Sequence, residues 1–377
     1  MNNQVKQFEL DVAQDQLDDL RARLERVRWP GEQPVEDWSQ GIPLSYIQDL
    51  AAYWADGYDW RRCERKLNAA QQFRTEIDGV DIHFLHARSP HEGALPLILT
   101  HGWPGSVREF LDLVEPLTDP PDPADAFHVV VPSLPGFGFS GRPSSTGWGV
   151  KRIADTWAEL MTRLGYPRFG AHGGDWGSVV SARLAAIAPD RVVGVHLPIP
   201  YVDLAAEPDP PESMNDFEKQ GAAISADYGT SGTGYFVEQM TKPQTLGYGL
   251  ADSPVGQLAW IVEKFHGWTD CVGHPENAVD RDALLDNVML YWLSNTGASA
   301  ARIYWESLAD LPRDQITVPT GCSIFPKEMI RVPRARAETR LVNIRYWNEL
   351  PAGGHFASLE QPKIFVEELR KFFRLVR

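Results

Sequence analysis

The sequence predicts an α/β fold with a mostly parallel central sheet and helices on both of its faces. Short apolar runs recur along the chain, LPLILTHG, FHVVVPSLPG, RFGAHGG and RVVGVHLP, and most are separated by segments of helical periodicity such as SVREFLDLVEPL and SVVSARLAAIA. Apolar runs that alternate with helices are typical of parallel strands. The strand pattern stops after Pro200 and returns in PTGCSIFP and NIRYWNELP, so the sequence between is expected to form an inserted, mainly helical cap.

The chain is expected to divide into an N-terminal helical meander (residues 1–92), a first core part (93–200), the cap (201–307) and a second core part (308–377). A first helix is predicted by four apolar residues at helical spacing and should end at a proline: Leu17, Leu20, Leu24, Val27 and Pro30. A second helix is predicted by the same spacing in Tyr46, Ile47, Leu50 and Trp54. FRTEIDGVDIHFLHA alternates around an Asp-Gly turn and predicts a hairpin, while PKIFVEELRKFFRLV predicts a final helix.

Composition excludes several classes of protein. The 377 residues are 43% hydrophobic and 23% charged, as expected for a globular chain, and the net charge of −15 argues against a nucleic-acid partner. Cys63, Cys271 and Cys322 lack CxxC spacing, which argues against a disulfide framework or a cysteine-rich zinc site. The N-terminus lacks a secretory signal pattern, and no apolar run reaches about 18 residues. We therefore expect a cytoplasmic protein without a membrane anchor.

The segment GAHGGDWGSVV places a carboxylate where a strand turns into a helix. Gly173-Gly174-Asp175-Trp176-Gly177 matches the G-x-nucleophile-x-G turn, in which small residues allow a strained connection and a close approach of the helix. The helix N-terminus favours negative charge, so we expect Asp175 to be ionised. An aspartate here could instead only cap the helix. The motif and its context favour a nucleophile.

A carboxylate suits attack on an sp3 carbon, because it is already deprotonated at neutral pH and needs no base for this step. The resulting alkyl ester must then be hydrolysed, and water needs a base. In folds with this turn, the nucleophile, the acid and the histidine follow one another along the chain. His355, in PAGGHFASLEQP, lies on a Gly-Gly loop after the last predicted strand. It is the predicted base.

The acid that orients His355 should lie on a loop after an earlier strand. Glu328 directly follows the strand PTGCSIF and is the preferred candidate. Asp203, after RVVGVHLPIPY, remains the alternative, because a loop at the preceding strand end could also reach the histidine.

An oxyanion hole requires backbone N–H groups near the nucleophile. One is expected from Trp176, the residue after Asp175, and the other from Trp103 in the loop HGWPG. Pro104 makes a cis peptide plausible in this loop, and His101 is interpreted as structural. PGFGFSGRP also contains G-x-G-x-x-G, but no helix follows at once, so it does not predict a dinucleotide cofactor.

Together these motifs resemble those of the microsomal-type epoxide hydrolases, the branch of the α/β-hydrolase superfamily that includes juvenile hormone epoxide hydrolases. The resemblance covers nearly the whole chain and rests on RWP, YDWRRCERKLN, HGWPGS, PGFGFS, GGDWGS, TKPQTLGYGLADSPVG, NVMLYW, PTG and GGHFASLEQP. It implies an α/β-hydrolase fold whose N-terminal meander packs over both cap and core. Animal members carry an N-terminal membrane anchor and this sequence begins without one, which indicates a soluble version. A homodimer remains open.

The resemblance also implies the reaction, in which an apolar epoxide and water give a vicinal diol through an ester on Asp175. Two cap tyrosines, Tyr235 and Tyr304, would hold and protonate the epoxide oxygen. Aromatic residues such as Trp268, Trp292 and Phe236 suggest an apolar epoxide, and Phe236 and Trp292 are expected to contact it. No metal or organic cofactor is expected, and detoxification is the expected role.

Two other functions remain open at this stage. A haloalkane dehalogenase also uses an aspartate followed by a tryptophan, but its halide leaves without protonation and has no use for paired tyrosines. A non-catalytic binding protein on the same scaffold would not need Asp175, Glu328 and His355 together.

Overall fold

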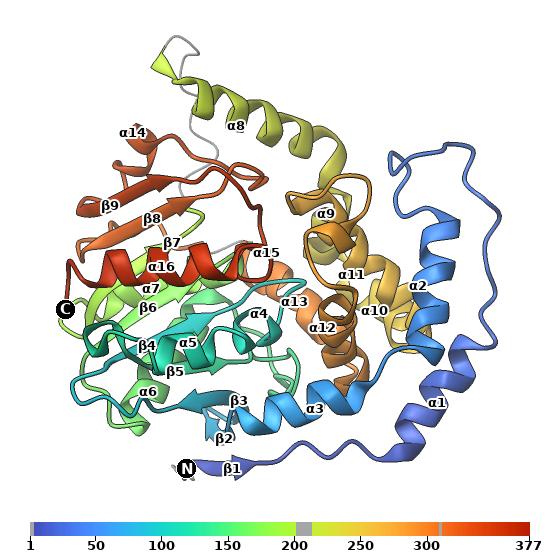
Figure 1. Cartoon of the computed structure of the whole chain (residues 1–377), viewed down its shortest axis with the longest axis horizontal. Coiled ribbons are helices and arrows are strands. Elements are labelled where there is room, and N and C mark those ends of the chain that lie inside the picture. The colour runs from blue at the N-terminus through green and yellow to red at the C-terminus, as the bar shows by residue number, and fades with distance from the viewer. Residues whose placement is uncertain (1–3, 201–212, 309–310) are drawn as a thin grey trace.

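The computed structural model describes residues 4–200, 213–308 and 311–377, which form the predicted α/β architecture (Figure 1). One nine-stranded sheet has the order β1-β2-β3-β5-β4-β6-β7-β8-β9. Its strands are β1 (Lys6–Phe8), β2 (Gln72–Ile77), β3 (Val80–Ala87), β4 (Leu95–Thr100), β5 (Phe127–Pro132), β6 (Phe169–Gly173), β7 (Val192–Leu197), β8 (Thr320–Ile324) and β9 (Ile344–Glu349). Strands β4 to β9 pair in parallel, and β1, β2 and β3 extend the sheet by antiparallel pairing.

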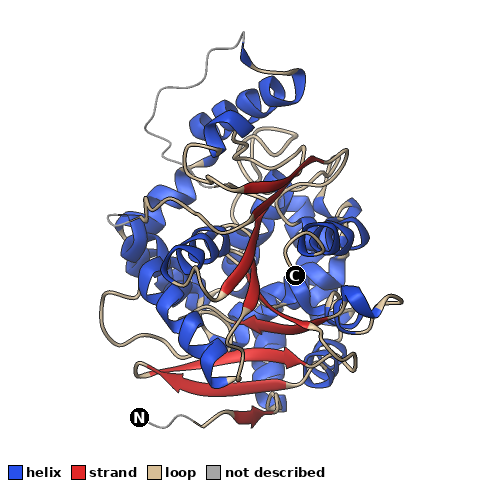
Figure 2. Ribbon diagram, turned by 90° about the vertical axis from the view of Figure 1, so that its left-hand side faces the viewer, coloured by secondary structure: helices blue, strands red, loops and turns tan. Residues whose placement is uncertain are grey.

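Helices lie on both sides of this twisted sheet, which Figure 2 shows nearly edge-on. The N-terminal helices are α1 (Gln14–Leu24), α2 (Leu44–Asp56) and α3 (Trp60–Ala69). The helices of the core are α4 (Arg108–Leu111), α5 (Val114–Thr118), α6 (Val150–Arg163), α7 (Trp176–Ile187), α14 (Arg334–Ala337), α15 (Ala357–Glu360) and α16 (Pro362–Phe373). Between β7 and β8 lie α8 (Asp216–Asp227), α9 (Gly234–Thr241), α10 (Pro243–Asp252), α11 (Pro254–Trp268), α12 (Arg281–Ser294) and α13 (Gly297–Ser307).

The hairpin and the second helix match the sequence-based expectation, but the first helix is shorter than expected. Helix α1 ends at Leu24, so Val27 and Pro30 lie beyond it. Leu20 and Leu24 already bury the apolar face of α1, and Val27 packs against the core from the chain that follows the helix. Helix α3 was missed, because its few buried apolar residues stand among charged ones in WRRCERKLNA.

The segment SVREFLDLVEPL forms two short helices, α4 and α5, instead of one. Pro116 explains the break. A proline has no N–H to donate, and its ring collides with the carbonyl group four residues earlier, here that of Asp112. Helix α4 therefore ends at Leu111, and the chain changes direction before α5 begins.

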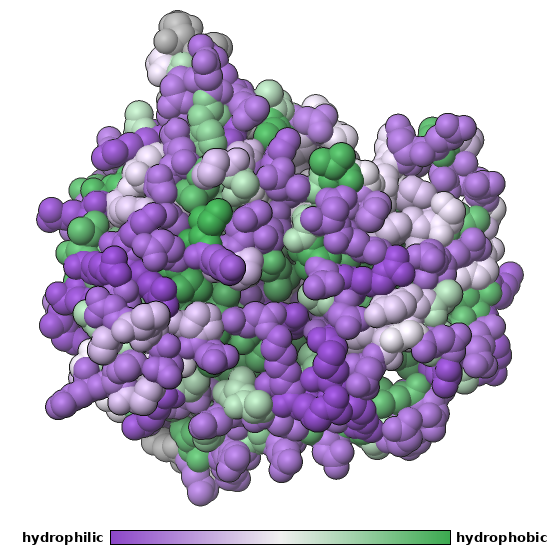
Figure 3. Space-filling view, in the orientation of Figure 1, coloured by the Kyte–Doolittle hydropathy of each residue, from purple (hydrophilic) through white to green (hydrophobic). Residues whose placement is uncertain are grey.

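The N-terminal segment contacts both the core and the helices inserted between β7 and β8. Helices α1 and α2 pack against α11, α3 packs against α12, and β3 pairs with β5 of the core (Figure 1). Hydrophilic side chains cover most of the face shown in Figure 3, where apolar groups form small patches. Within the described part of the chain, no helix is both long and apolar enough to span a membrane.

Candidate active site

Asp175 stands at the sharp turn between β6 and α7. Its backbone has a φ of 51° and a ψ of −128°, a conformation that costs a non-glycine residue on the order of 1–3 kcal/mol. A Cβ atom on Gly177 would lie 2.0 Å from the Thr100 carbonyl oxygen, so only glycine lets α7 approach β4 this closely. The Asp175 side chain makes no capping hydrogen bond to α7. This geometry argues against a capping role and presents the carboxylate at the edge of the sheet.

The two carboxylate oxygens of Asp175 have different surroundings. Oδ1 accepts a hydrogen bond of 2.8 Å from the Trp103 N–H, and the Trp176 N–H is near enough to the carboxylate to lower its pKa. Oδ2 lies 3.6 Å from His355 Nε2. Burial raises the pKa of Asp175, although His355 and the two N–H groups lower it. Burial thus opposes the ionisation that the helix N-terminus was expected to favour.

The approach of the HGWPG loop to Asp175 depends on a glycine. A Cβ atom on Gly102 would lie 2.1 Å from Asp175 Oδ1. The Trp103–Pro104 peptide bond is cis. His101 is buried, contacts Gly102 O through Nδ1 at 2.9 Å and accepts the Leu134 N–H through Nε2 at 3.2 Å. Both ring nitrogens of His101 are therefore engaged within the loop region, as in a structural histidine.

His355 lies between two carboxylates. Its Nδ1 atom is 3.0 Å from each oxygen of Glu328, and the 2% exposure of that residue keeps water away from the pair. Burial lowers the pKa of His355, but the negative charges of Glu328 and Asp175 outweigh burial and raise it to about 9. Nδ1–H donates to Glu328, so Nε2 is the nitrogen that faces Asp175. The alternative acid, Asp203, lies outside the described residues.

The loop that carries His355 is held by a second, partly buried glutamate. The Glu360 carboxylate accepts the N–H groups of Gly354 at 3.0 Å, Phe356 at 3.1 Å and Asp270 at 2.7 Å. Burial raises the pKa of Glu360 to about 7. These bonds fix the backbone on both sides of His355 and join it to the chain after α11.

Tyr235, on α9, and Tyr304, on α13, face Asp175 from the inserted helices. Both are buried, and their ring centres are 5.9 Å apart at 86°. The Trp103 ring stacks on Tyr235 with centres 5.0 Å apart, and the Trp176 ring meets Tyr304 edge-on at 4.9 Å. The side chains of Trp103 and Trp176, the two residues predicted as oxyanion donors, thus also pack against the two tyrosines.

The structure brings Phe236 to the site but not Trp292. The Phe236 ring lies 5.4 Å from Tyr304. Trp292, near the end of α12, faces the guanidinium group of Arg23 on α1 at 5.8 Å and borders a surface pocket there. Tyr291, the residue directly before Trp292, is buried instead. Trp268 is an aromatic neighbour of the site, with its ring 5.0 Å from His355 and 5.2 Å from Tyr235.

Sequence reasoning missed three polar groups around these residues. Glu109, on α4, is buried, and burial raises its pKa to about 8 although His355 lowers it. Lys264, on α11, places its ammonium group 4.6 Å from the centre of the Tyr235 ring. The hydroxyl group of Tyr228 lies 2.8 Å from that of Tyr235. Only the position of Glu109, shortly after HGWPG, gave a signal in the sequence.

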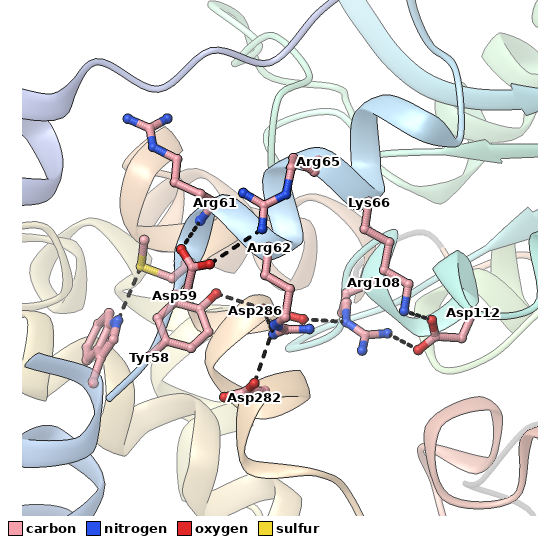
Figure 4. Close-up of polar contacts among 12 residues, drawn as sticks. Tyr58, Asp59, Arg61, Arg62, Arg65, Lys66, Arg108, Asp112, Asp282 and Asp286 are labelled. Atoms are coloured by element: carbon pink, nitrogen blue, oxygen red, sulfur yellow. Dashed lines mark hydrogen bonds and ion pairs between the residues drawn. The ribbon is translucent and has the colours of Figure 1, made fainter. Parts of the chain in front are cut away.

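Ion pairs around the buried Asp286 join the core, the inserted helices and the N-terminal segment (Figure 4). Asp286, on α12, is fully buried and pairs with Arg108 of α4 at 3.0 Å and with Arg62 of α3 at 2.8 Å. It also accepts the hydroxyl group of Tyr58 at 2.7 Å. Arg108 makes a further ion pair with Asp112 at 2.8 Å. The Asp286 carboxylate thus connects the core, the inserted helices and the N-terminal segment.

Helix α12 also holds the loop that donates the Trp103 N–H. Asn287 accepts the Ser106 hydroxyl at 2.6 Å and donates to the Pro104 carbonyl at 2.8 Å. Tyr291 donates to the Gly105 carbonyl at 2.7 Å. In the described ranges, no group of three or more His, Cys, Asp and Glu side chains could hold a metal ion.

A mostly parallel sheet, a carboxylate on a strained strand-to-helix turn, and a Glu–His pair after later strands define an α/β hydrolase. A family model described as "Epoxide hydrolase N terminus" matches residues 5–110, and one described as "alpha/beta hydrolase fold" matches residues 96–232.

Individual relatives agree with these matches. A protein of Stigmatella aurantiaca (strain DW4/3-1), provisionally named an epoxide hydrolase, is 52% identical over 98% of this chain and 85% of its own. The solved structure of Aspergillus niger epoxide hydrolase is 34% identical, covers 99% of this chain and 97% of its own, and has a TM-score of 0.91. That of juvenile hormone epoxide hydrolase from Bombyx mori is 29% identical, with coverages of 99% and 95% and a TM-score of 0.89. The chain belongs to the epoxide hydrolase family.

Proposed function

We propose that this protein converts an epoxide and water to a vicinal diol, with Asp175 as the nucleophile. The observation that carries the proposal is the pair of unlike oxygens on Asp175. One is held by the Trp103 N–H, and the other faces His355. Two buried tyrosines opposite this carboxylate suit an electrophile that leaves an oxygen behind.

In the first step, Asp175 Oδ2 attacks one epoxide carbon. The carbon–oxygen bond of the ring breaks, and its electron pair goes to the epoxide oxygen. Tyr235 and Tyr304 donate hydrogen bonds to that oxygen, and a phenol supplies the proton that converts it to a hydroxyl group. Burial raises the pKa of both tyrosines well above the usual value, so both are neutral donors before reaction. The product is a hydroxyalkyl ester of Asp175.

In the second step, His355 Nε2 takes a proton from water, and the resulting hydroxide attacks Cγ of the ester. Negative charge then develops on Oδ1, which accepts the Trp103 N–H, and the Trp176 N–H is the second proposed donor. Glu328 stabilises the imidazolium form of His355. The tetrahedral intermediate collapses, the leaving alcohol oxygen takes the proton from His355, and Asp175 loses the acid proton to solvent as its carboxylate re-forms.

The dehalogenase and binding-protein alternatives are not favoured. A halide leaves without a proton and gives no role to Tyr235 and Tyr304. A binding protein has no need for a histidine whose pKa two carboxylates raise to about 9. The aromatic groups around Asp175 support an apolar epoxide as substrate.

Three finer statements belong to this proposal. The inserted helices act as a cap that supplies the oxygen-binding groups. The protein acts in the cytoplasm, as supported by its three free cysteines, and removes reactive epoxides there. A homodimer is the oligomeric state to test first, and sedimentation of the purified protein would decide it.

The intact mass of the His355→Gln variant tests the proposal. After exposure to aryl, alkyl and terpenoid epoxides, its mass should rise by one whole epoxide, because the ester forms but is not hydrolysed. The His355→Gln/Asp175→Asn variant is the control and should gain nothing. A gain only from a bromoalkane would assign dehalogenase chemistry. Substantial diol formation by Asp175→Ala would exclude covalent catalysis at this residue, since loss of a nucleophile costs at least about 10⁴-fold.

A further inference from the structure

The two tyrosines that face Asp175 have unlike surroundings. The Tyr304 hydroxyl group is buried and has no hydrogen-bond partner within the described ranges, while the ring packs against Trp176, Phe236 and Tyr235. Tyr235 has two polar neighbours, Tyr228 and Lys264. A phenol that gives up its proton becomes an anion, and a buried anion needs such neighbours.

Lys264 lies over the face of the Tyr235 ring. Its ammonium group is 4.6 Å from the ring centre of Tyr235 and 5.9 Å from that of Trp268, and the Lys264 side chain is only 9% exposed. It also forms an ion pair with Glu263 on the same helix. A cation over an aromatic ring attracts its π electrons, and the attraction grows when the ring becomes a phenolate. Lys264 therefore favours proton loss from Tyr235.

Tyr228 supplies the second stabilising contact. It lies in the π-helical turn Tyr228–Gly232 after α8, is half-buried, and has its hydroxyl oxygen 2.8 Å from that of Tyr235. When Tyr235 donates to the substrate, its oxygen can still accept the Tyr228 hydroxyl hydrogen. The Tyr235 phenolate would keep this hydrogen bond, whereas the Tyr304 hydroxyl group makes no hydrogen bond within the described ranges.

We propose that Tyr235 is the acid that protonates the opened epoxide, that Tyr304 only donates a hydrogen bond, and that Lys264 and Tyr228 are positioning residues that stabilise the Tyr235 phenolate. The inference rests on the proposed function. The alkoxide takes the Tyr235 proton as the carbon–oxygen bond breaks. After ester hydrolysis, the acid proton released from Asp175 to solvent balances that proton, and Tyr235 regains one through Tyr228. No other reactant is needed.

Rates of ester formation test this assignment, measured by rapid mixing in the His355→Gln background, where the ester accumulates. Lys264→Met should slow ester formation from an alkyl epoxide about tenfold, Lys264→Arg should recover most of the rate, and Tyr228→Phe should lower it severalfold. Tyr235→Phe should cost more than Tyr304→Phe. Lys242→Met, which removes an exposed lysine of the same group of helices, is the matched control and should leave the rate unchanged.

A second epoxide separates proton transfer from a loss of structure. An analogue with a trifluoromethyl group beside the ring gives a less basic alkoxide, so Lys264→Met should slow its reaction less. Lys264→Gln serves if the methionine variant does not fold. If Lys264→Met slowed ester formation equally for both epoxides, or if Tyr304→Phe slowed it more than Tyr235→Phe, the inference would be overturned. The proposed function would still stand. If the His355→Gln protein forms no ester from any epoxide, the proposed function itself falls.

Discussion

The two sides of the candidate site are built from different interactions. On the core side, Asp175 and His355 are held by hydrogen bonds to backbone N–H groups and to a buried carboxylate. On the side of the inserted helices, Tyr235 and Tyr304 are held mainly by rings packed face-on and edge-on. The first side stabilises charges, and the second places neutral donors opposite them.

This difference suggests how one small site can perform two steps. Ring opening needs a carboxylate and a proton donor, while ester hydrolysis needs a base and an oxyanion hole. The donors come from the inserted helices, and the base and the hole come from the core. Only Asp175 takes part in both steps, so variants on the two sides should affect different half-reactions.

The largest effect should come from removing both hydroxyl groups opposite Asp175. Tyr235→Phe/Tyr304→Phe should slow ester formation by about 10²–10⁴-fold, because the epoxide oxygen would leave without a proton donor. Rapid-quench mass analysis measures this step. Tyr248→Phe, at a position 70% exposed, is the control and should not change it. A normal rate of ester formation in the double variant would show that other groups are the acids.

A smaller effect is expected at the ion pairs that join the two sides. Asp286→Ala leaves Arg108 and Arg62 without a fully buried partner, so the free energy of unfolding should fall by about 3–5 kcal/mol in urea titrations. Asp282→Ala removes a partner of Arg62 that is 34% exposed and should cost less than about 1 kcal/mol. Equal losses in the two variants would mean that the buried pairs do not hold the regions together.

The pH dependence of ester hydrolysis should be the mildest effect. Glu328 and Asp175 raise the pKa of His355 to about 9, and ester formation removes the negative charge of Asp175, so the pKa should fall in the ester. Below that pKa the imidazolium form cannot act as a base, and hydrolysis should slow about tenfold per pH unit. Glu109, whose charge also acts on His355 and whose pKa burial raises to about 8, should add to the pH profile. Single-turnover decay of the ester measures the hydrolysis rate at each pH. A rate that does not change with pH would show that His355 is not the base.

The core side was largely predictable from the sequence, because the chain itself encodes it locally. A glycine-flanked aspartate, a glutamate after a strand and a histidine on a glycine loop all stand at strand ends, and parallel strands bring those ends to one edge. The structure accordingly places Glu328 against His355 and His355 near Asp175.

The other side was not readable from local patterns. Tyr235 and Tyr304 were assigned by resemblance alone. Of the aromatic residues that suggested an apolar substrate, Phe236 and Trp268 lie beside the site and Trp292 does not. Lys264 and Tyr228 gave no signal in the sequence. A single lysine in an apolar helix usually points its ammonium group to solvent, so Lys264 did not stand out. Their positions depend on how helices pack, which involves residues far apart in the chain.

Because the two oxygens of Asp175 are unequal, the proposed reaction should pass an oxygen atom from one turnover to the product of the next. Oδ1 stays beside the Trp103 N–H, whereas the oxygen that attacks the epoxide leaves with the diol. Water replaces only that lost atom. Each diol would thus carry an oxygen that entered the protein in the previous cycle, and a fresh enzyme molecule would give its own oxygen to the first product it releases.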